Sequence, residues 1–422
     1  MLKVKRASQL NFRRKVLYIT YDGILEPLGQ SQVLRYLTRL AEHHDISLIS
    51  FEKPQDWADT NRRHALERQI SDANVTWVPL RYHKRPSALA TAFDIVQGCV
   101  VGTWLLFRHR VEIVHARSYV SSVIALVLKK LFAVKYIFDM RGFWADERVD
   151  GGIWPVKGGM YRAAKWFERK FLMNADIVVS LTNAAVTEMR TFTYLQRNMP
   201  RFEVITTCAD LDLFRYEDLN IDHLKICSPS PIGDTEFTLG YVGSVGGWYL
   251  FDEALRSFKI LCERIPNTQL RILNRGEHDY IRERMEALDI DPNRVKIEVA
   301  DAEGVARAMQ KMDAGIFFIR PIYSKTASAP TKLGEFLGCG VPCLGNSGVG
   351  DMAAILEGEK VGIAVSSFDD QALRAGIDQL LKLVMQPDIK IRCREAALKN
   401  FSLEDGVRSY DRIYRDLESG VA

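Results

Sequence analysis

Two sets of short, continuously apolar segments alternate with amphipathic segments along the chain, and this pattern constrains the fold more than any other feature. Helical patterns such as 31–42 and 161–175 lie between the apolar segments. Uninterrupted apolar runs followed by helices are typical of parallel sheets that are covered on both faces. We therefore predict an α/β protein with two doubly wound, Rossmann-like domains facing each other across a cleft. The apolar segments are 15–20, 45–50, 75–80, 111–116, 135–140, 175–182 and 202–207, then 237–243, 268–274, 295–300, 314–319, 341–346 and 362–367.

The length of the chain also favours two domains, because 422 residues exceed the size at which a single hydrophobic core stops growing. A polar break at 215–236, rich in Asp, Pro and Ser, predicts the linker between them. The predicted units are a first domain at 1–214, a second domain at 237–400 and a closing helical segment at 401–422.

The two halves of the chain differ in charge. Residues 1–210 carry 31 Lys and Arg against 20 Asp and Glu, whereas residues 211–422 carry 26 against 33. A basic first domain predicts contact with an anionic ligand or surface. The seven cysteines include no C-x-x-C pair, which indicates reduced thiols in a cytosolic protein and neither a disulfide framework nor a zinc site.

Two segments of the basic half predict contact with a membrane. Residues 1–15 carry six cations and no acid, and residues 84–110 predict an apolar helix between basic pairs. The charge-free stretch 95–107 is shorter than the ~20 residues that cross a bilayer as a helix, so we expect a soluble or peripheral cytoplasmic protein. We predict docking on the inner face of the cytoplasmic membrane. The alternative is that 87–109 is a core helix and that the N-terminus is a solvated tail.

The stretch KTASAPTKLGEFLGCGVPCLG, residues 325–345, carries the clearest candidate site. Pro330 is favoured at the start of a helix, where the N–H groups of Thr331 and Lys332 remain free to bind an anion. A lysine in the first turn opposes the helix dipole unless an anion binds there. Together with Arg320 and Lys325, it suits a diphosphate, and Glu335 could accept hydrogen bonds from a ribose. The alternative is that Lys332 and Glu335 form an ordinary surface pair.

Five stretches, which follow one another along nearly the whole chain in the order expected for the family, resemble retaining GT-B enzymes of glycosyltransferase family 4. The resemblance implies that the closing helix crosses back to the first domain, that the second domain binds a nucleotide-diphosphate sugar through Glu335, and that no metal or other cofactor is needed. It also implies that the first domain binds the acceptor and that the leaving diphosphate helps to deprotonate it. The stretches are EPLGQSQVLRYLTRLAE (26–42), VITTCADLDLF (204–214), YVGSVGGWY (241–249), SAPTKLGEFLGCGVPCLG (328–345) and FSLEDGVRSYDRIYRDL (401–417).

The chain departs from the family pattern at the donor site. The first of the two glutamates usual in the family would fall at Ala327, and the usual arginine after Gly243 is Ser244. The lysine expected soon after falls among the aromatics at 248–249. We expect Arg320, Lys325 and Lys332 to replace the missing cations, with help from Arg275, and the base to contact the backbone near 299–300.

The first domain carries further candidates at predicted strand ends. Arg141 falls where many relatives place a histidine, so it could stabilise the leaving diphosphate or the reacting sugar; we therefore name Arg141 and Lys332 as catalytic candidates. Asp139, Glu147 and Arg148 are acceptor-side candidates, although a structural ion-pair network would place charges there equally well. Gly29 either presents backbone amides to the ligand or simply forms a turn.

The predicted function is transfer of a sugar from a nucleotide-diphosphate sugar to an acceptor hydroxyl with retention of anomeric configuration. The partners implied are the sugar nucleotide and an acceptor glycan or lipid-linked saccharide, in cell-surface polysaccharide synthesis; no feature predicts nucleic-acid binding. Two alternatives stay open. One is a GT-B sugar-nucleotide epimerase, and the other is a non-catalytic protein that binds sugar nucleotides or acts in assembly, which the loss of a glutamate at Ala327 makes plausible.

Overall fold

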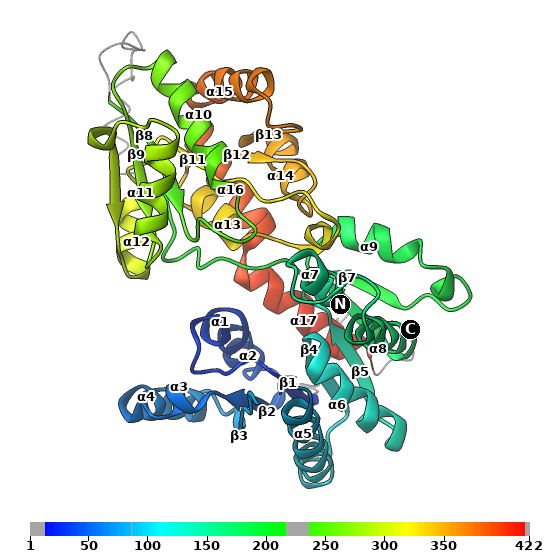
Figure 1. Ribbon diagram of the computed structural model, residues 1–422. Helices are drawn as coiled ribbons and strands as arrows, with labels where there is room; N and C mark the ends of the chain where they lie inside the picture. Colours follow the sequence, from blue (N-terminus) through cyan, green and yellow to red (C-terminus); the bar gives the residue numbers. More distant parts are fainter. Residues whose placement is uncertain (1–12, 86, 217–235, 418–422) are drawn as a thin grey trace, which may run out of the picture.

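The computed structural model describes residues 13–85, 87–216 and 236–417, which form two α/β domains (Figure 1). The first contains a seven-stranded sheet in which every neighbouring pair is parallel, with the order β3-β2-β1-β4-β5-β6-β7. The predicted class, two Rossmann-like parallel-sheet domains, is confirmed. The strands are β1 (Lys15–Thr20), β2 (Asp45–Glu52), β3 (Thr76–Arg81), β4 (Ile113–Arg117), β5 (Lys135–Asp139), β6 (Ile177–Ser180) and β7 (Arg201–Val204).

Helices cover both faces of the first sheet, which explains why its strands are apolar throughout. One core contains residues of α5 (Ser87–His109), α6 (Ser118–Leu131), α8 (Gly159–Asn174) and α9 (Asn183–Arg190). The opposite core contains residues of α2 (Arg35–Leu40), α4 (Thr60–Asp72) and the closing helix α17 (Leu403–Asp416). Shorter helices are α1 (Pro27–Gly29), the π-helix η1 (Gln30–Leu34), α3 (Pro54–Trp57), α7 (Trp144–Asp150) and η2 (Thr193–Leu195).

The second domain contains a six-stranded parallel sheet in the order β10-β9-β8-β11-β12-β13 around one large core. Its strands are β8 (Phe237–Val242), β9 (Thr268–Leu273), β10 (Val295–Glu298), β11 (Ala314–Ile316), β12 (Cys343–Asn346) and β13 (Gly362–Val365). Its helices are α10 (Phe251–Arg264), α11 (His278–Ala287), η4 (Pro292–Arg294), α12 (Ala302–Met309), η5 (Tyr323–Ala327), α13 (Thr331–Gly338), α14 (Met352–Gly358), α15 (Asp370–Val384) and α16 (Ile389–Phe401).

The chain passes between the domains twice, and the two crossings lie side by side. After β7, the Ala209 N–H donates to the carbonyl oxygen of Phe401, the last residue of α16 (3.0 Å). Ser402 then caps α17, which packs against α2 of the first domain. The closing helix therefore returns to the first domain, as the resemblance implied. The predicted linker, 215–236, lies almost wholly outside the described residues, as does most of the basic N-terminal segment.

Helix α5 has the extent that the sequence analysis predicted for the apolar helix within 84–110. With Ala88–His109 it is the one helix in the described part of the chain that is long and apolar enough to cross a membrane, at a mean hydropathy of 1.5. The argument that 95–107 is too short was wrong because it stopped at Asp94. That carboxylate is buried and accepts hydrogen bonds from the Tyr21 hydroxyl (2.7 Å) and the His83 N–H (3.1 Å), so it faces the protein and does not interrupt the apolar surface.

Candidate functional site

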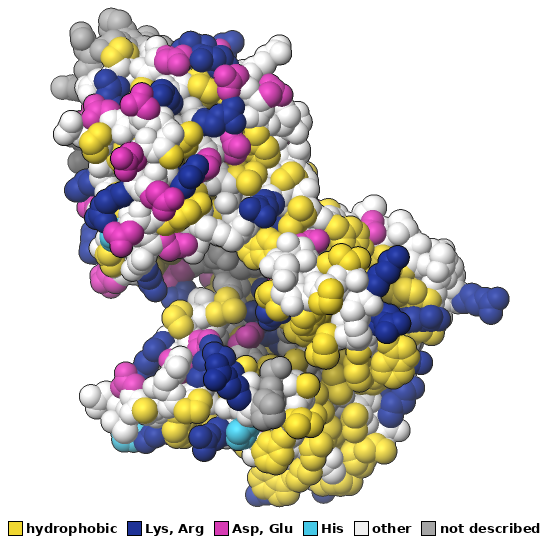
Figure 2. All heavy atoms as spheres, in the orientation of Figure 1, with side chains coloured by type: hydrophobic (Ala, Val, Ile, Leu, Met, Phe, Trp, Pro, Cys, Tyr) yellow, Lys and Arg dark blue, Asp and Glu magenta, His cyan; other side chains and the backbone are white. Residues whose placement is uncertain are grey.

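A cavity of about 560 Å³ lies between the two domains. The space-filling view shows the hollow between the upper and lower parts of the molecule (Figure 2). The first domain lines the cavity with α1, η1 and the start of α2, and the second domain with the carboxyl ends of β8 and β9 and the start of α13. In doubly wound sheets ligands bind beyond the carboxyl ends of the strands. The lining residues that matter below are Leu28, Ser31, Gln32, Arg35, Asp210, Gly243, Ser244, Asn274, Arg275, Glu277, Ala300, Thr331 and Glu335.

Helix α13 presents its amino end to this cavity. Pro330 is the N-cap residue and supplies no side-chain cap, so the first-turn amides remain available. Thr331 and Glu335, four residues apart on one helical face, both line the cavity. The helix begins where the stretch 325–345 predicted and brings Thr331 and Glu335 to the cavity, while their binding of a diphosphate and a ribose stays a prediction.

Lys332 lies beneath the loop that follows β8. Its Nζ atom lies 3.8 Å from the centre of the Tyr249 ring and 5.4 Å from that of Phe317. Gly243, which lines the cavity, has φ 106°, and a Cβ there would come within 2.9 Å of the ammonium. Within the described ranges, this buried Nζ has no hydrogen-bond partner. An orphaned ammonium next to a ligand cavity indicates a place for an anion.

The two ionisable groups of α13 have opposite pKa shifts from the same cause. Burial lowers the pKa of Lys332 to about 7, and Glu335 and Glu277 only partly offset it. Burial also raises the pKa of Glu335 to about 7, against the attraction of Lys332. For both groups burial outweighs the attraction between the two charges, and perturbed groups of this kind concentrate at functional sites.

A hydrogen-bond network fixes the β8 loop, and the sequence analysis overlooked its central residue, Glu277. The Glu277 carboxylate accepts from the amide of Asn274 (2.9 Å) and from the backbone N–H of Val245 (3.2 Å). The Asn274 amide also donates to the Gly243 carbonyl oxygen (3.0 Å). Burial alone would raise the pKa of Glu277, but these donors outweigh it and lower it. Glu277 lies two residues after Arg275, the one residue of this stretch that the sequence analysis predicted for the donor site.

The predicted phosphate cations are only partly assembled. Arg275 lines the cavity, as expected, but Arg320 and Lys325 do not. Arg320 is exposed. The Lys325 ammonium is buried, donates to the Glu147 carboxylate (2.6 Å) and lies 3.9 Å from the centre of the Trp248 ring. Lys325 and Glu147 therefore form a bridge between the domains, and we withdraw Arg320 and Lys325 as diphosphate ligands in this conformation.

The first domain adds a cation that the sequence analysis missed. Arg35, at the start of α2, lines the cavity and pairs with Asp210, which also lines it. Among the described lining residues, Arg35 and Arg275 are the two cations, one from each domain. Gly29 does not line the cavity; a Cβ there would collide with the Gly23 carbonyl, so it acts as a close-packing residue.

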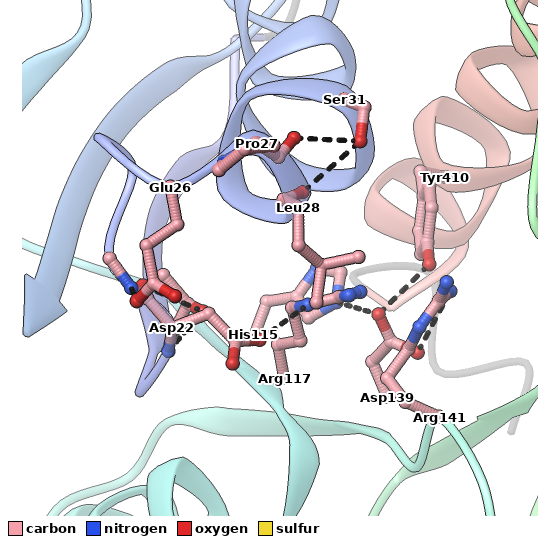
Figure 3. A network of polar contacts seen from close by, with 12 residues as sticks. Asp22, Glu26, Pro27, Leu28, Ser31, His115, Arg117, Asp139, Arg141 and Tyr410 are labelled. Atoms are coloured by element: carbon pink, nitrogen blue, oxygen red, sulfur yellow. Dashed lines mark hydrogen bonds and ion pairs between the residues drawn. The ribbon is translucent and has the colours of Figure 1, made fainter. Parts of the chain in front are cut away.

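The Arg141 loop belongs to a buried cluster at the ends of β4 and β5 (Figure 3). The strand register places Arg117 beside Asp139. The Asp139 carboxylate accepts from the Tyr410 hydroxyl of α17 (3.1 Å) and lies 3.7 Å from His115 Nε2 and 3.8 Å from the Arg141 guanidinium. Burial alone would raise the pKa of Asp139, but Arg141 and His115 outweigh it and lower it.

This geometry gives Asp139 the structural role that the sequence analysis kept open. Arg141 has φ 58°, a conformation that is strained for a non-glycine residue, and its side chain is 11% exposed. Neither residue lines the cavity. Arg148 does not line it either, and its guanidinium lies over the Trp144 ring (5.4 Å). Of the acceptor-side candidates, Glu147 takes part in the contact between the domains, through its ion pair with Lys325.

Helix η5 of the second domain contributes to that contact. The Tyr323 ring stacks on Phe143 (5.3 Å between centroids), and the Thr326 carbonyl oxygen accepts from the Thr182 hydroxyl (2.8 Å). Ala327, where relatives carry a glutamate, is buried in the core of the first domain. The departure from the family pattern therefore coincides with a buried apolar position at the contact between the domains, where a carboxylate would be desolvated. No group of three His, Cys, Asp or Glu side chains that could hold a metal occurs among the described residues.

Comparisons with known proteins agree with this architecture. Residues 29–205 match the family model described as "Glycosyl transferase 4-like domain", and residues 225–398 match "Glycosyl transferases group 1". A comparison with curated protein sequences gives no match.

Solved structures share the fold over nearly the whole chain. A glycosyltransferase from Rickettsia africae is 14% identical, with a TM-score of 0.68 over 97% of this chain and 99% of that one. Sucrose-phosphate synthase from Thermosynechococcus elongatus is 15% identical, with a TM-score of 0.66 over 96% and 100%. Anabaena HepE in complex with UDP-glucose is 15% identical, with a TM-score of 0.63 over 96% and 99%.

Proposed function

The chain is a GT-B glycosyltransferase of the family 4 type, and we propose that it transfers a sugar from a nucleotide-diphosphate sugar to an acceptor hydroxyl with retention of anomeric configuration. The observation that carries the proposal is the orphaned Lys332 ammonium next to the open amino end of α13, at a cavity shared by both domains. The family matches favour transfer over the epimerase and the non-catalytic alternatives.

In the proposed complex the second domain binds the donor. The diphosphate lies at the amino end of α13, where the Thr331 amide, Lys332 and Arg275 meet its charge. Glu335 accepts hydrogen bonds from the ribose hydroxyls, and the base lies near Ala300. Because HepE was solved with UDP-glucose, a uridine nucleotide is the first donor to test.

The acceptor enters from the first domain, along Leu28, Ser31 and Gln32. The bond from the acceptor oxygen to the anomeric carbon forms on the face from which the diphosphate leaves. The carbon–oxygen bond to the diphosphate breaks, and a diphosphate oxygen takes the acceptor proton. The protein contributes positioning and charge stabilisation. The basic first domain supports an anionic, lipid-linked or cell-surface glycan acceptor.

The first experiment measures nucleotide binding by calorimetry with UDP, GDP and ADP. We expect one of them, UDP first, to bind, and Glu335→Ala to weaken binding at least about tenfold through the lost ribose contacts. Glu357→Ala, at an exposed position on α14, is the matched control. Equal affinity of wild type and Glu335→Ala would overturn the site assignment.

The second experiment follows turnover of the matching sugar nucleotides, with and without acceptors and with and without divalent cations. A transferred sugar with unchanged anomeric configuration by NMR supports the proposal. An epimerised sugar nucleotide, an inverted product, or tight binding without turnover on any acceptor would each contradict it.

A further inference from the structure

The outer face of α5 is an exposed apolar stripe. Six large apolar side chains, each more than half exposed, recur at intervals of three and four residues and so lie on one face of the helix. From Ala88 to Phe107 the one charged residue is Asp94, which is buried on the opposite side. At 1.5 Å per residue the stripe is ~30 Å long. It consists of Leu89, Phe93, Val96, Val100, Trp104 and Phe107.

The same face extends over the neighbouring helices. Helix α6 lies against α5 and α8 lies against α6. Leu131 at the end of α6 and Met160 and Trp166 on α8 are also more than half exposed. Figure 2 shows hydrophobic side chains gathered over the lower right part of the molecule, which these three helices occupy in Figure 1. Contiguous apolar surface of this extent marks an interaction site.

Cations surround this face. Exposed Lys84 and Arg85 precede the stripe, Arg108 and Arg110 follow it, and Lys130 lies next to Leu131. Between residues 84 and 176 the chain carries fifteen Lys and Arg against eight Asp and Glu. Four of those acids are buried, namely Asp94, Asp139, Asp146 and Glu168. An apolar stripe with cations at its edges complements the acyl and headgroup regions of an anionic bilayer.

The inner face of α5 rules out a free membrane span in this fold. A Cβ at Gly98 would collide with Ile124, and one at Gly102 would lie 2.9 Å from a Leu128 methyl, so the two glycines bring α5 tightly against α6. Asp94 on this side is hydrogen-bonded within the domain. The helix is therefore attached along its length, and only its outer face is available to a partner.

A second copy of the chain fits this face poorly. Both ends of the stripe carry cations, so pairing two α5 helices in either direction would bring basic ends together. Like charges in contact oppose association, whereas anionic headgroups neutralise them.

We propose that the α5 stripe, with the adjoining ends of α6 and α8, lies in the interfacial region of an anionic phospholipid bilayer and holds the protein there without crossing it. The proposal is independent of the donor site. Helices α5, α6 and α8 pack on one face of the first sheet, whereas α2, which lines the cavity, packs on the other face.

The test is co-sedimentation of the full chain with phosphatidylcholine vesicles, with and without phosphatidylglycerol. We expect binding that requires phosphatidylglycerol and a loss of at least about tenfold in partitioning for Val100→Glu, because a charge then enters the apolar layer. The matched control is Ile391→Glu, at an exposed apolar position on α16 of the second domain, which should bind like wild type.

Tryptophan quenching by brominated lipids gives the depth. We expect quenching that Trp104→Phe reduces and that is stronger for bromines near the headgroups than for those at the bilayer centre. Stronger quenching from the centre would overturn the interfacial arrangement. The proposal would be overturned if the wild type did not sediment with vesicles, or if Val100→Glu sedimented with them as the wild type does. It would also be overturned if Val100→Glu changed a dimer into a monomer without affecting lipid binding. UDP affinity of Val100→Glu, measured in parallel, separates this failure from a failure of the donor site.

Discussion

The Lys332 ammonium lies 3.8 Å from the centre of the Tyr249 ring. This cation–π contact partly offsets the free-energy cost of burying the ammonium. A cation over an aromatic face is stabilised by about 1–2 kcal/mol, which is less than the cost of burying an unpaired charge. The site is therefore organised around a charge that the ligand-free protein does not satisfy. Five predictions follow from this and from the contacts around it.

Replacing Lys332 with methionine should stabilise the ligand-free protein and abolish nucleotide binding. Methionine fills the aromatic pocket without a desolvated ammonium, so we expect a gain of about 1 kcal/mol in the free energy of unfolding near pH 7. Denaturant titration with and without UDP measures both effects. A variant that is destabilised yet binds UDP normally would show that Lys332 has a packing role only.

The stability of the wild type should depend on pH through the same residue. The pKa of Lys332 is about 7 in the folded protein, below the ordinary value of 10.5. Between these values the unfolded chain binds more protons, so this group makes the free energy of unfolding rise with pH across that window. Denaturant titration of wild type and Lys332→Met over this pH range isolates the contribution of Lys332. The free energy of unfolding of the variant should rise less with pH than that of the wild type.

Binding of UDP should take up a proton at about pH 8. There Lys332 is mostly neutral and Glu335, with a pKa of about 7, is mostly ionised. A bound diphosphate favours the charged ammonium and raises the pKa of Lys332. Calorimetry in buffers of different ionisation enthalpy measures the uptake, and Glu335→Gln should keep it. Absence of uptake in the wild type would place the diphosphate away from Lys332.

Arg275 and Lys325 should behave differently although both were predicted to bind phosphate. Arg275→Ala should weaken UDP binding by about 1–3 kcal/mol because it removes a cation from the cavity. Lys325→Met should leave intrinsic UDP affinity nearly unchanged and weaken the contact between the domains instead. Small-angle scattering and UDP calorimetry on both variants decide the matter; similar losses of affinity would return Lys325 to the donor site.

Replacing Ala327 with glutamate should separate the domains. The residue is 1% exposed within the first domain's core, so a carboxylate there must either be desolvated or leave. We expect a larger radius of gyration by small-angle scattering, with Ala329→Glu, at a less buried position nearby, as the control. An unchanged radius of gyration would mean that the contact tolerates a charge.

The sheets and the start of α13 could be predicted because their signals are local. Continuous apolar runs determine a parallel strand, and Pro330 determines where the helix begins, which places Thr331 and Glu335 on one face. The roles assigned to these residues stay predictions until a ligand is bound.

The remaining site residues could not be predicted because their positions depend on contacts between distant segments. Lys325 is drawn away from α13 by Glu147 of the other domain. Arg35 reaches the cavity only because α2 faces the second domain. The uninterrupted apolar surface of α5 depends on Tyr21 and His83, which bind the buried Asp94 carboxylate. Sequence periodicity contains none of this information.

The position of α17 has a consequence for how the protein is made. Its residues Val407, Tyr410, Ile413 and Tyr414 complete a core of the first domain, and Tyr414 shares a hydrogen bond with His115 (2.7 Å). During synthesis on the ribosome, the first domain emerges almost two hundred residues before the helix that closes it. One apolar face of the nascent domain therefore stays exposed until translation is almost finished. Chaperones have the longest time to bind the chain at that face.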